Sequence, residues 1–205
     1  MSVKGTTLLI TTKRFEALVD AIFGVAMTLL ALSIAIPLLT TISDSLLLQG
    51  LAGMFHQFIV FAFAFILLAV FWFHNHEFFS LLKETDSIFF WINIFWLMLI
   101  ALVPFSASLT GAYGILTIAA VFFHVNMLLI GLLFYISVVY AIRKGFVSDP
   151  FKARKVKLDA ISLPLAAVSA ILFAVFSVPR WSYFMYLLTF PFDWIISKLD
   201  KKFGN

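Results

Sequence analysis

The stretch from Lys13 to Leu39, KRFEALVDAIFGVAMTLLALSIAIPLL, decides how this sequence can fold. It begins with charged residues, carries an acid at Asp20, and continues from Ala21 to Leu39 without another charge. About 20 consecutive apolar residues are enough for a helix to cross a hydrocarbon core ~30 Å thick. An acid at the head of such a run needs a partner, because charge near lipid is costly. The stretch therefore predicts a transmembrane helix with a functional side chain near its start.

A helical wheel of this stretch separates an uncharged stripe from the acid. With about 100° per residue and Asp20 at zero, the stripe lies between about 80° and about 180° and carries three aliphatic side chains around one hydroxyl. Its members are Val25, Thr28, Leu29 and Leu32. A stripe of this kind can pack on neighbouring helices or line a pore.

The composition restricts the class of protein. Of 205 residues, 63% are hydrophobic and 12% are charged. A soluble domain cannot bury that much apolar surface, and the uncharged runs are longer than the strands of a membrane β-barrel. The fold class is therefore all-α and polytopic. The net charge of +4 comes from bases in loops, which membrane topology explains without a nucleic-acid partner.

The uncharged runs predict six transmembrane helices in a single domain, residues 1–205. The first covers residues 13–39 and the second is one long helix between Asp44 and Glu77. A glycine-bounded turn at Gly111–Gly114 divides the next run. The remaining spans are expected at 87–109, 113–141, 159–178 and 181–197. Pro191 and Asp193 interrupt the sixth span.

Six spans place every lysine and arginine except Arg180 on one side of the membrane. The positive-inside rule then makes that side, with both termini, cytoplasmic. The first helix is expected to remain as a signal anchor, because no cleavage site follows it. The chain is expected in a membrane as a multi-pass protein.

Polar residues within the predicted spans need hydrogen-bond partners. We expect His56, Gln57, His124 and Asn126 to join helices. Asn93 lies about two turns into the third span, at a depth comparable to that of Asp20.

His74 and His76 close the second span on the side where Asp20 enters the membrane. Residues two apart point to opposite sides of a helix, and no carboxylate cluster completes a metal site. We expect one of these histidines, without distinguishing which, to pair with Asp20. The sequence contains no catalytic motif, so we expect neither an enzyme nor a cofactor.

Two motifs carry a resemblance to a known family. Arg14, three residues, and then Leu18-Val19-Asp20 resembles R-x-x-x-F-S-D, with Leu and Val in place of Phe and Ser. In the third span, Asp86, Asn93, Val103-Pro104-Phe105 and Ser108-Leu109 follow a second pattern, which Trp72 and the nearby histidines precede. Both patterns resemble the transmembrane protein 175 family, the endosomal and lysosomal potassium channels and their bacterial homologues.

The resemblance implies a homotetramer of six-span subunits, most simply in a bacterial inner membrane, with the first helices around a central pore that conducts K⁺. The partners would be K⁺, membrane lipids and further copies of the chain. Four residues would line the pore: an apolar constriction at Val25, Leu29 and Leu32, and a selectivity-linked hydroxyl at Thr28. A polar network behind the pore would consist of Arg14, Asp20, Asn93 and one of His74 and His76.

Two other functions fit the sequence. A small proton-coupled secondary transporter would use Asp20, His56 or His124 as a proton relay. A membrane scaffold would conduct no ions.

Overall fold

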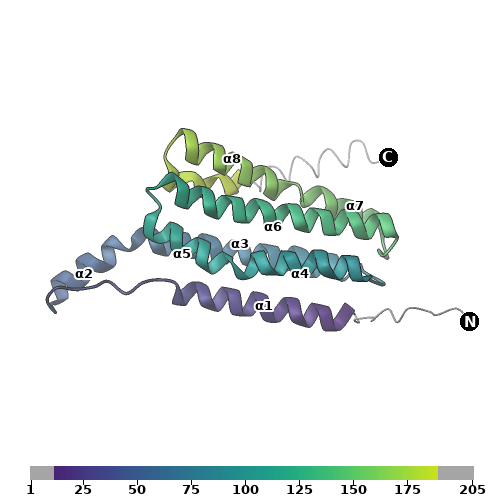
Figure 1. Cartoon of the computed structure of the whole chain (residues 1–205), viewed down its shortest axis with the longest axis horizontal. Helices are drawn as coiled ribbons and strands as arrows, with labels where there is room; N and C mark the ends of the chain where they lie inside the picture. The colour runs from purple at the N-terminus through teal and green to yellow at the C-terminus, as the bar shows by residue number, and fades with distance from the viewer. Residues whose placement is uncertain (1–11, 189–205) are drawn as a thin grey trace, which may run out of the picture.

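The computed structural model describes residues 12–188, which fold into a bundle of helices (Figure 1). Within this range all regular elements are helical, as the composition predicts. They are α1 (Thr12–Leu32), α2 (Asp44–Gly53), α3 (Phe55–Phe79), α4 (Ser87–Ala101), α5 (Val103–Tyr113), α6 (Thr117–Lys144), α7 (Pro150–Asp159), α8 (Ser162–Phe176) and the 3₁₀-helix η1 (Pro179–Leu188).

The first helix is shorter than predicted, because it ends at Leu32 and not at Leu39. Pro37 explains the end of α1. A proline ring clashes with the carbonyl four residues earlier, which here belongs to Ser33, and the residue before a proline disfavours the helical conformation. The chain beyond α1 is therefore an irregular connector, although it is as apolar as the helix itself.

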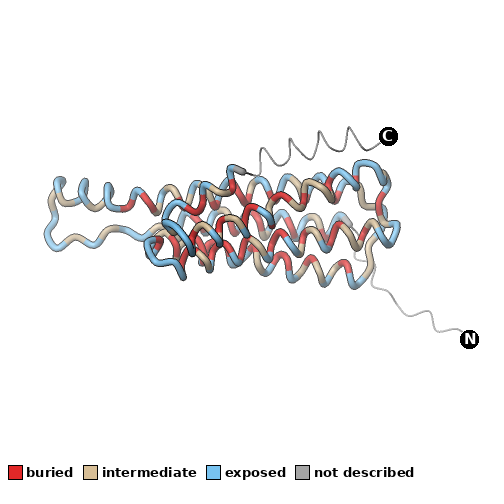
Figure 2. The backbone as a smooth tube through the Cα atoms, turned by 90° about the horizontal axis from the view of Figure 1, so that it is seen from above, coloured by how far each residue is buried: buried red, intermediate tan, exposed pale blue. Residues whose placement is uncertain are grey.

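The predicted second span is also wrong in one respect, since it divides into α2 and α3 at Met54. Helix α2 has no buried residues. It and the connector extend beyond the end of the bundle, where Figure 2 shows them exposed or half-buried, with no buried residue. Gly50 lets the connector lie close to α2, because a Cβ at this position would be 2.9 Å from Pro37 Cβ. Only α3 therefore represents the second span.

The third span consists of α4 and α5, which are separated at Leu102. Pro104 lies in the first turn of α5, where its missing amide is tolerated. Asp86 caps α4, and its side chain accepts a hydrogen bond of 2.8 Å from the Phe89 amide. The predicted turn after this span is present at Gly114, and α6 then continues to Lys144. Gly145, with φ of 74°, terminates α6 in the left-handed conformation that favours glycine.

The basic segment after α6 is partly helical, because α7 forms within it and leads into α8. Five helical segments in the described range are long and apolar enough to cross a membrane. They are Lys13–Leu32, Phe55–Phe79, Ser87–Tyr113, Thr117–Lys144 and Pro150–Phe176. The predicted sixth span overlaps η1 and otherwise lies outside the described residues, as do Pro191 and Asp193.

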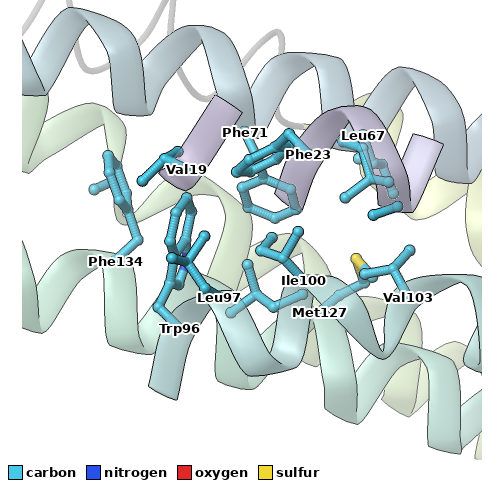
Figure 3. Packing of buried hydrophobic residues seen from close by; sticks show 14 of the residues in the cluster. Val19, Phe23, Leu67, Phe71, Trp96, Leu97, Ile100, Val103, Met127 and Phe134 are labelled. Atoms are coloured by element: carbon cyan, nitrogen blue, oxygen red, sulfur yellow. The ribbon is translucent and has the colours of Figure 1, made fainter. Parts of the chain in front are cut away.

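The core lies between α1, α3, α4 and α6. Figure 3 shows Val19 and Phe23 of α1 directed toward Trp96 and Ile100 of α4. The rings of Phe23 and Trp96 have centroids 5.5 Å apart. Helix α1 packs on α3, α4 and α5, whereas α6 packs mainly on α8 and α4. Helix α1 therefore forms one edge of the bundle (Figure 1).

Candidate pore-lining helix

Helix α1 has one buried face, and this face attaches it to the rest of the bundle. Five side chains at helical spacing are almost completely buried: Phe15, Val19, Phe23, Ala26 and Leu30. Close packing of these side chains between the helices stabilises this arrangement, because lipid tails are as apolar as the side chains themselves. This face was not predicted from the sequence, although its spacing is as regular as that of the stripe.

The uncharged stripe lies on the opposite side of α1. Val25 is 57% exposed, Leu29 44% and Leu32 81% in the single chain. At about 100° per residue, the centre of the stripe is about 130° around the helix from the centre of the buried face. Most of the stripe therefore lies outside the packing of its own subunit. It is free to contact a second copy, an aqueous path or lipid.

Thr28 is the one hydroxyl of the stripe, and its side chain is exposed. Its Oγ1 donates a hydrogen bond of 2.8 Å to the carbonyl oxygen of Val25. The hydroxyl proton is therefore directed at the backbone of α1. Because a hydroxyl oxygen has two acceptor lone pairs, Thr28 Oγ1 presents acceptor capacity outward, which suits a cation.

Asp20 does not pair with a histidine, so this prediction is wrong. Trp72 of α3 instead donates a hydrogen bond from Nε1 to Asp20 Oδ1 at 2.8 Å. An indole N–H is a permanent donor, whereas a histidine nitrogen donates only in one tautomer or when protonated. The carboxylate therefore has a partner whose hydrogen bonding does not depend on pH.

His76 binds a different acid of α1. Its Nδ1 lies 3.2 Å from Glu16 Oε1. The His76 ring also stacks on Trp72, with centroids 5.7 Å apart and an interplanar angle of 17°. Glu16 and Asp20 are four residues apart on α1, and Trp72 and His76 are four apart on α3. Two i,i+4 pairs thus face each other and join the two helices.

Three other residues of the predicted network are not brought to this cluster. Asn93 is buried and donates from Nδ2 to Ser137 Oγ of α6 at 2.9 Å and to the Phe89 carbonyl at 2.8 Å. Arg14 is exposed, and no ion pair to it is formed within residues 12–188. The His74 ring lies edge-on to Phe73. In the single chain, the cluster that holds α1 therefore consists of Glu16, Asp20, Trp72 and His76.

Glu16 and Trp72 had no assigned role in the cluster from sequence. The signal that could have found them is the equal spacing of the two pairs, with two acids one turn apart on the first span and two ring N–H groups one turn apart on the second. This spacing indicates a contact only if the two helix ends lie side by side, and sequence periodicity does not show that they do.

The other predicted polar residues join helices near the opposite end of the bundle. His124 of α6 lies with Nε2 2.6 Å from Ser182 Oγ and Nδ1 3.0 Å from Tyr186 Oη. Asn126 donates from Nδ2 to Ser106 Oγ at 3.3 Å. The His56 ring lies 6.1 Å from that of Tyr183. Across residues 12–188, no group of three or more metal-ligating side chains forms a candidate metal site.

Comparisons with known proteins agree with this architecture. A sequence model of the family described as endosomal/lysosomal potassium channel TMEM175 matches residues 14–104. This range contains the whole stripe and all four residues of the α1–α3 cluster.

Two curated relatives are similar in sequence. A potassium channel of Chamaesiphon minutus is 35% identical over 102 residues, which are 50% of this chain and 50% of the relative. The match therefore spans half the length of that protein. A potassium channel of Streptomyces collinus is 26% identical over 169 residues, or 80% of this chain and 77% of the relative.

Two solved structures are similar in fold. The crystal structure of a lysosomal potassium-selective channel TMEM175 homolog from Chamaesiphon minutus has a TM-score of 0.78 and 26% identity, covering 90% of this chain and 97% of that one. A variant of the potassium channel MtTMEM175 has a TM-score of 0.63, with 98% and 99% of the two chains covered. Its 17% identity supports the fold alone. Taken with the sequence matches, these similarities show that the chain is a multi-pass membrane protein and a homologue of the TMEM175 channels.

Proposed function

We propose that the chain is a potassium-permeable channel, formed by four copies whose α1 helices surround a central pore. Relatives that resemble it over most of their length are named potassium channels. Each subunit would be one domain of six spans over residues 1–205. The basic side of the bundle, with both termini, would face the cytoplasm of a bacterial cell, because the bases gather there.

One observation carries the proposal. Helix α1 presents an uncharged stripe with a single hydroxyl on the side opposite its packed face, and α1 lies at the edge of its own bundle. If the stripe faced only lipid, nothing would require a hydroxyl in it. If copies of α1 meet along it, the same stripe forms stacked rings of identical side chains.

The ring formed by Thr28 would supply the selectivity. Four hydroxyl oxygens can replace part of the water around a cation without adding a fixed charge. K⁺ holds its water less tightly than Na⁺ does, so uncharged oxygens favour K⁺. The sequence has no TVGYG loop, whose many carbonyl oxygens replace the whole hydration shell in other potassium channels. We therefore propose a K⁺ over Na⁺ preference that is weaker than that of such a filter.

The rings formed by Val25, Leu29 and Leu32 would form the gate. A narrow apolar constriction loses its water when its radius falls, which stops conduction without a physical plug. Opening would widen this constriction by moving α1. The hydrogen bond from Trp72 to Asp20 and the contact of His76 with Glu16 would hold the start of α1 in place during that movement.

The test is the reversal potential of the purified protein in a planar bilayer with K⁺ on one side and Na⁺ on the other. We expect single-channel currents whose reversal potential is displaced from zero toward the equilibrium potential of K⁺. Thr28→Ala should move this reversal potential toward zero while conduction continues. The matched control is Thr117→Ala, which removes a hydroxyl at the start of α6 and should leave the reversal potential unchanged. Unchanged selectivity in Thr28→Ala would reject the role of Thr28.

The same recording separates the alternatives. A proton-coupled transporter would give a saturating flux driven by a pH gradient and no single-channel steps, and a scaffold would give no flux. Both ring nitrogens of His124 already have partners in Ser182 and Tyr186. This arrangement favours a structural role for His124 over a proton relay.

A further inference from the structure

The outer surface of α4 and α6 carries an open groove that the proposed pore does not use. Its volume is about 510 Å³, and all the residues that line it are apolar. The walls include Trp91, Phe95 and Met98 from α4 and Leu129 and Leu133 from α6. The three α4 side chains are each more than half exposed.

The dimensions of the groove match one leaflet of a bilayer. It follows α4 from Ile88 to Leu99. At 1.5 Å per residue this distance is about 17 Å, close to half of a hydrocarbon core ~30 Å thick. The groove therefore has the depth of the acyl chains of one leaflet.

The groove leads to a lysine at the end of the bundle where the bases gather. On α6, the wall residues Leu129 and Leu133 share a face with Tyr140 and Lys144, since all four lie within about 60° around the helix. Lys144 Nζ lies 5.6 Å from the centroid of the Tyr140 ring. Tyr140 in turn donates from Oη to Asp86 Oδ2 at 2.6 Å, so the mouth is next to the start of α4.

The charge at this mouth is available to a ligand. Both carboxylate oxygens of Asp86 already accept hydrogen bonds, one from the Phe89 amide and one from Tyr140. No carboxylate in residues 12–188 forms an ion pair with Lys144. Lys83 lies nearby, because its amide donates to the Phe146 carbonyl at 2.8 Å just beyond the end of α6. Glu84 is exposed next to Lys83, and Asp86 keeps a negative charge that attracts Lys144. The three bases Lys83, Arg143 and Lys144 therefore outnumber the two acids at this mouth.

We propose that this groove binds an anionic phospholipid, with an acyl chain between α4 and α6 and the phosphate of the headgroup at Lys144. The apolar walls match the chain and the lysine matches the phosphate. The Tyr140 ring, at the level between them, resembles the aromatic side chains that gather at membrane interfaces. A second copy of the chain is a poorer match, because two copies facing each other across this groove would bring the same bases together. The proposal does not depend on the pore.

The test measures which lipid occupies the groove from the fluorescence of Trp91. The full chain is reconstituted into phosphatidylcholine vesicles that contain either brominated phosphatidylglycerol or brominated phosphatidylcholine at the same mole fraction. The Trp91 signal is the difference between the parent protein and Trp91→Phe. We expect brominated phosphatidylglycerol to quench this signal more strongly than brominated phosphatidylcholine.

Lys144→Gln should lower the preference for phosphatidylglycerol about fivefold, the factor that corresponds to about 1 kcal/mol per base near a membrane surface. Lys144→Arg should keep the preference, because it keeps the positive charge. The matched control is Lys155→Gln, which removes an exposed lysine of α7 and should have no effect. Equal quenching by the two lipids, or a preference that Lys144→Gln leaves intact, would overturn the proposal. Absence of quenching by either lipid would mean that protein covers the groove, and would also overturn it.

Discussion

The hydrogen bond between Trp72 and Asp20 offers the sharpest test of how α1 is held. It joins α3 to α1 at 2.8 Å between Nε1 and Oδ1. We predict that replacing either partner destabilises the protein and that the two replacements together cost less than the sum of their separate effects. Trp72→Phe keeps an aromatic ring but removes the donor, and Asp20→Ala removes the acceptor.

The magnitude follows from the environment of the bond. A hydrogen bond to a charged group contributes about 1.5–3 kcal/mol when it is shielded from solvent. Asp20 is exposed and Trp72 is 39% exposed in the single chain, so we expect a coupling energy of about 1 kcal/mol. For a chain of this size, that energy corresponds to a shift in Tm of about 2–4 °C. Trp72→Phe alone should cost more, because the ring of Trp72 also stacks on His76.

The assay is a double-mutant cycle on the purified chain in detergent, with thermal unfolding followed by circular dichroism. Trp91→Phe is the matched control, because it removes an exposed indole of α4 that has no hydrogen bond within residues 12–188, and should change stability by no more than about 0.5 kcal/mol. If the effects of Trp72→Phe and Asp20→Ala are simply additive, the hydrogen bond contributes nothing. Helix α1 would then be held by its buried apolar face alone.

Three further predictions follow from the described contacts. Leu29→Ser should raise the resting conductance in planar bilayers, because a ring of polar side chains keeps water in the constriction. The control Leu172→Ser on α8 should leave the conductance unchanged. Equal conductance in the two variants would argue against the gate. Asn93→Ala should lower the free energy of unfolding by about 1–3 kcal/mol, since it leaves Ser137 without its partner in the core. Unfolding in increasing concentrations of a denaturing detergent measures this change. A change near zero would mean that Asn93 contributes little to stability. Desolvation acts to raise the pKa of Asp86, but hydrogen bonds from Tyr140 and the Phe89 amide outweigh it and hold that pKa below its usual 3.8. The stability that results is therefore present above that usual value and is lost as the pH falls through the lower pKa of the folded state. Tyr140→Phe should consequently move acid unfolding to higher pH, and an unmoved acid transition would contradict this account.

The predicted spans show which features of the fold a hydropathy pattern can determine. It predicts an all-helical membrane fold, and it places the turn after the third span correctly at Gly114. It does not predict the helix ends near Pro37, Met54 and Pro104, because an apolar run has the same hydropathy whether or not a helix continues through it. Two of these breaks have a proline as their local signal, and the residues around Met54 carry only glycines.

The α1–α3 cluster shows a second limit. Asp20 was identified as needing a partner, because a charge at the head of a membrane helix is costly. Its partner depended on the relative rotation of α1 and α3, which brought Trp72 to Asp20 and His76 to Glu16. A histidine was chemically reasonable, but the indole one turn earlier is nearer.

The sequence by itself determined that the chain crosses a membrane several times and which residues of α1 share a face, since length, hydropathy and the 3.6-residue period are local properties. Only the tertiary structure decided which of the two apolar faces of α1 is packed. Phe15, Val19, Phe23, Ala26 and Leu30 are buried, and Val25, Leu29 and Leu32 are left outside. The physical reason is that a membrane helix gains little from hydrophobicity when it exchanges lipid for protein. Shape complementarity with the neighbouring helices chooses the packed face, and that property belongs to the assembled bundle.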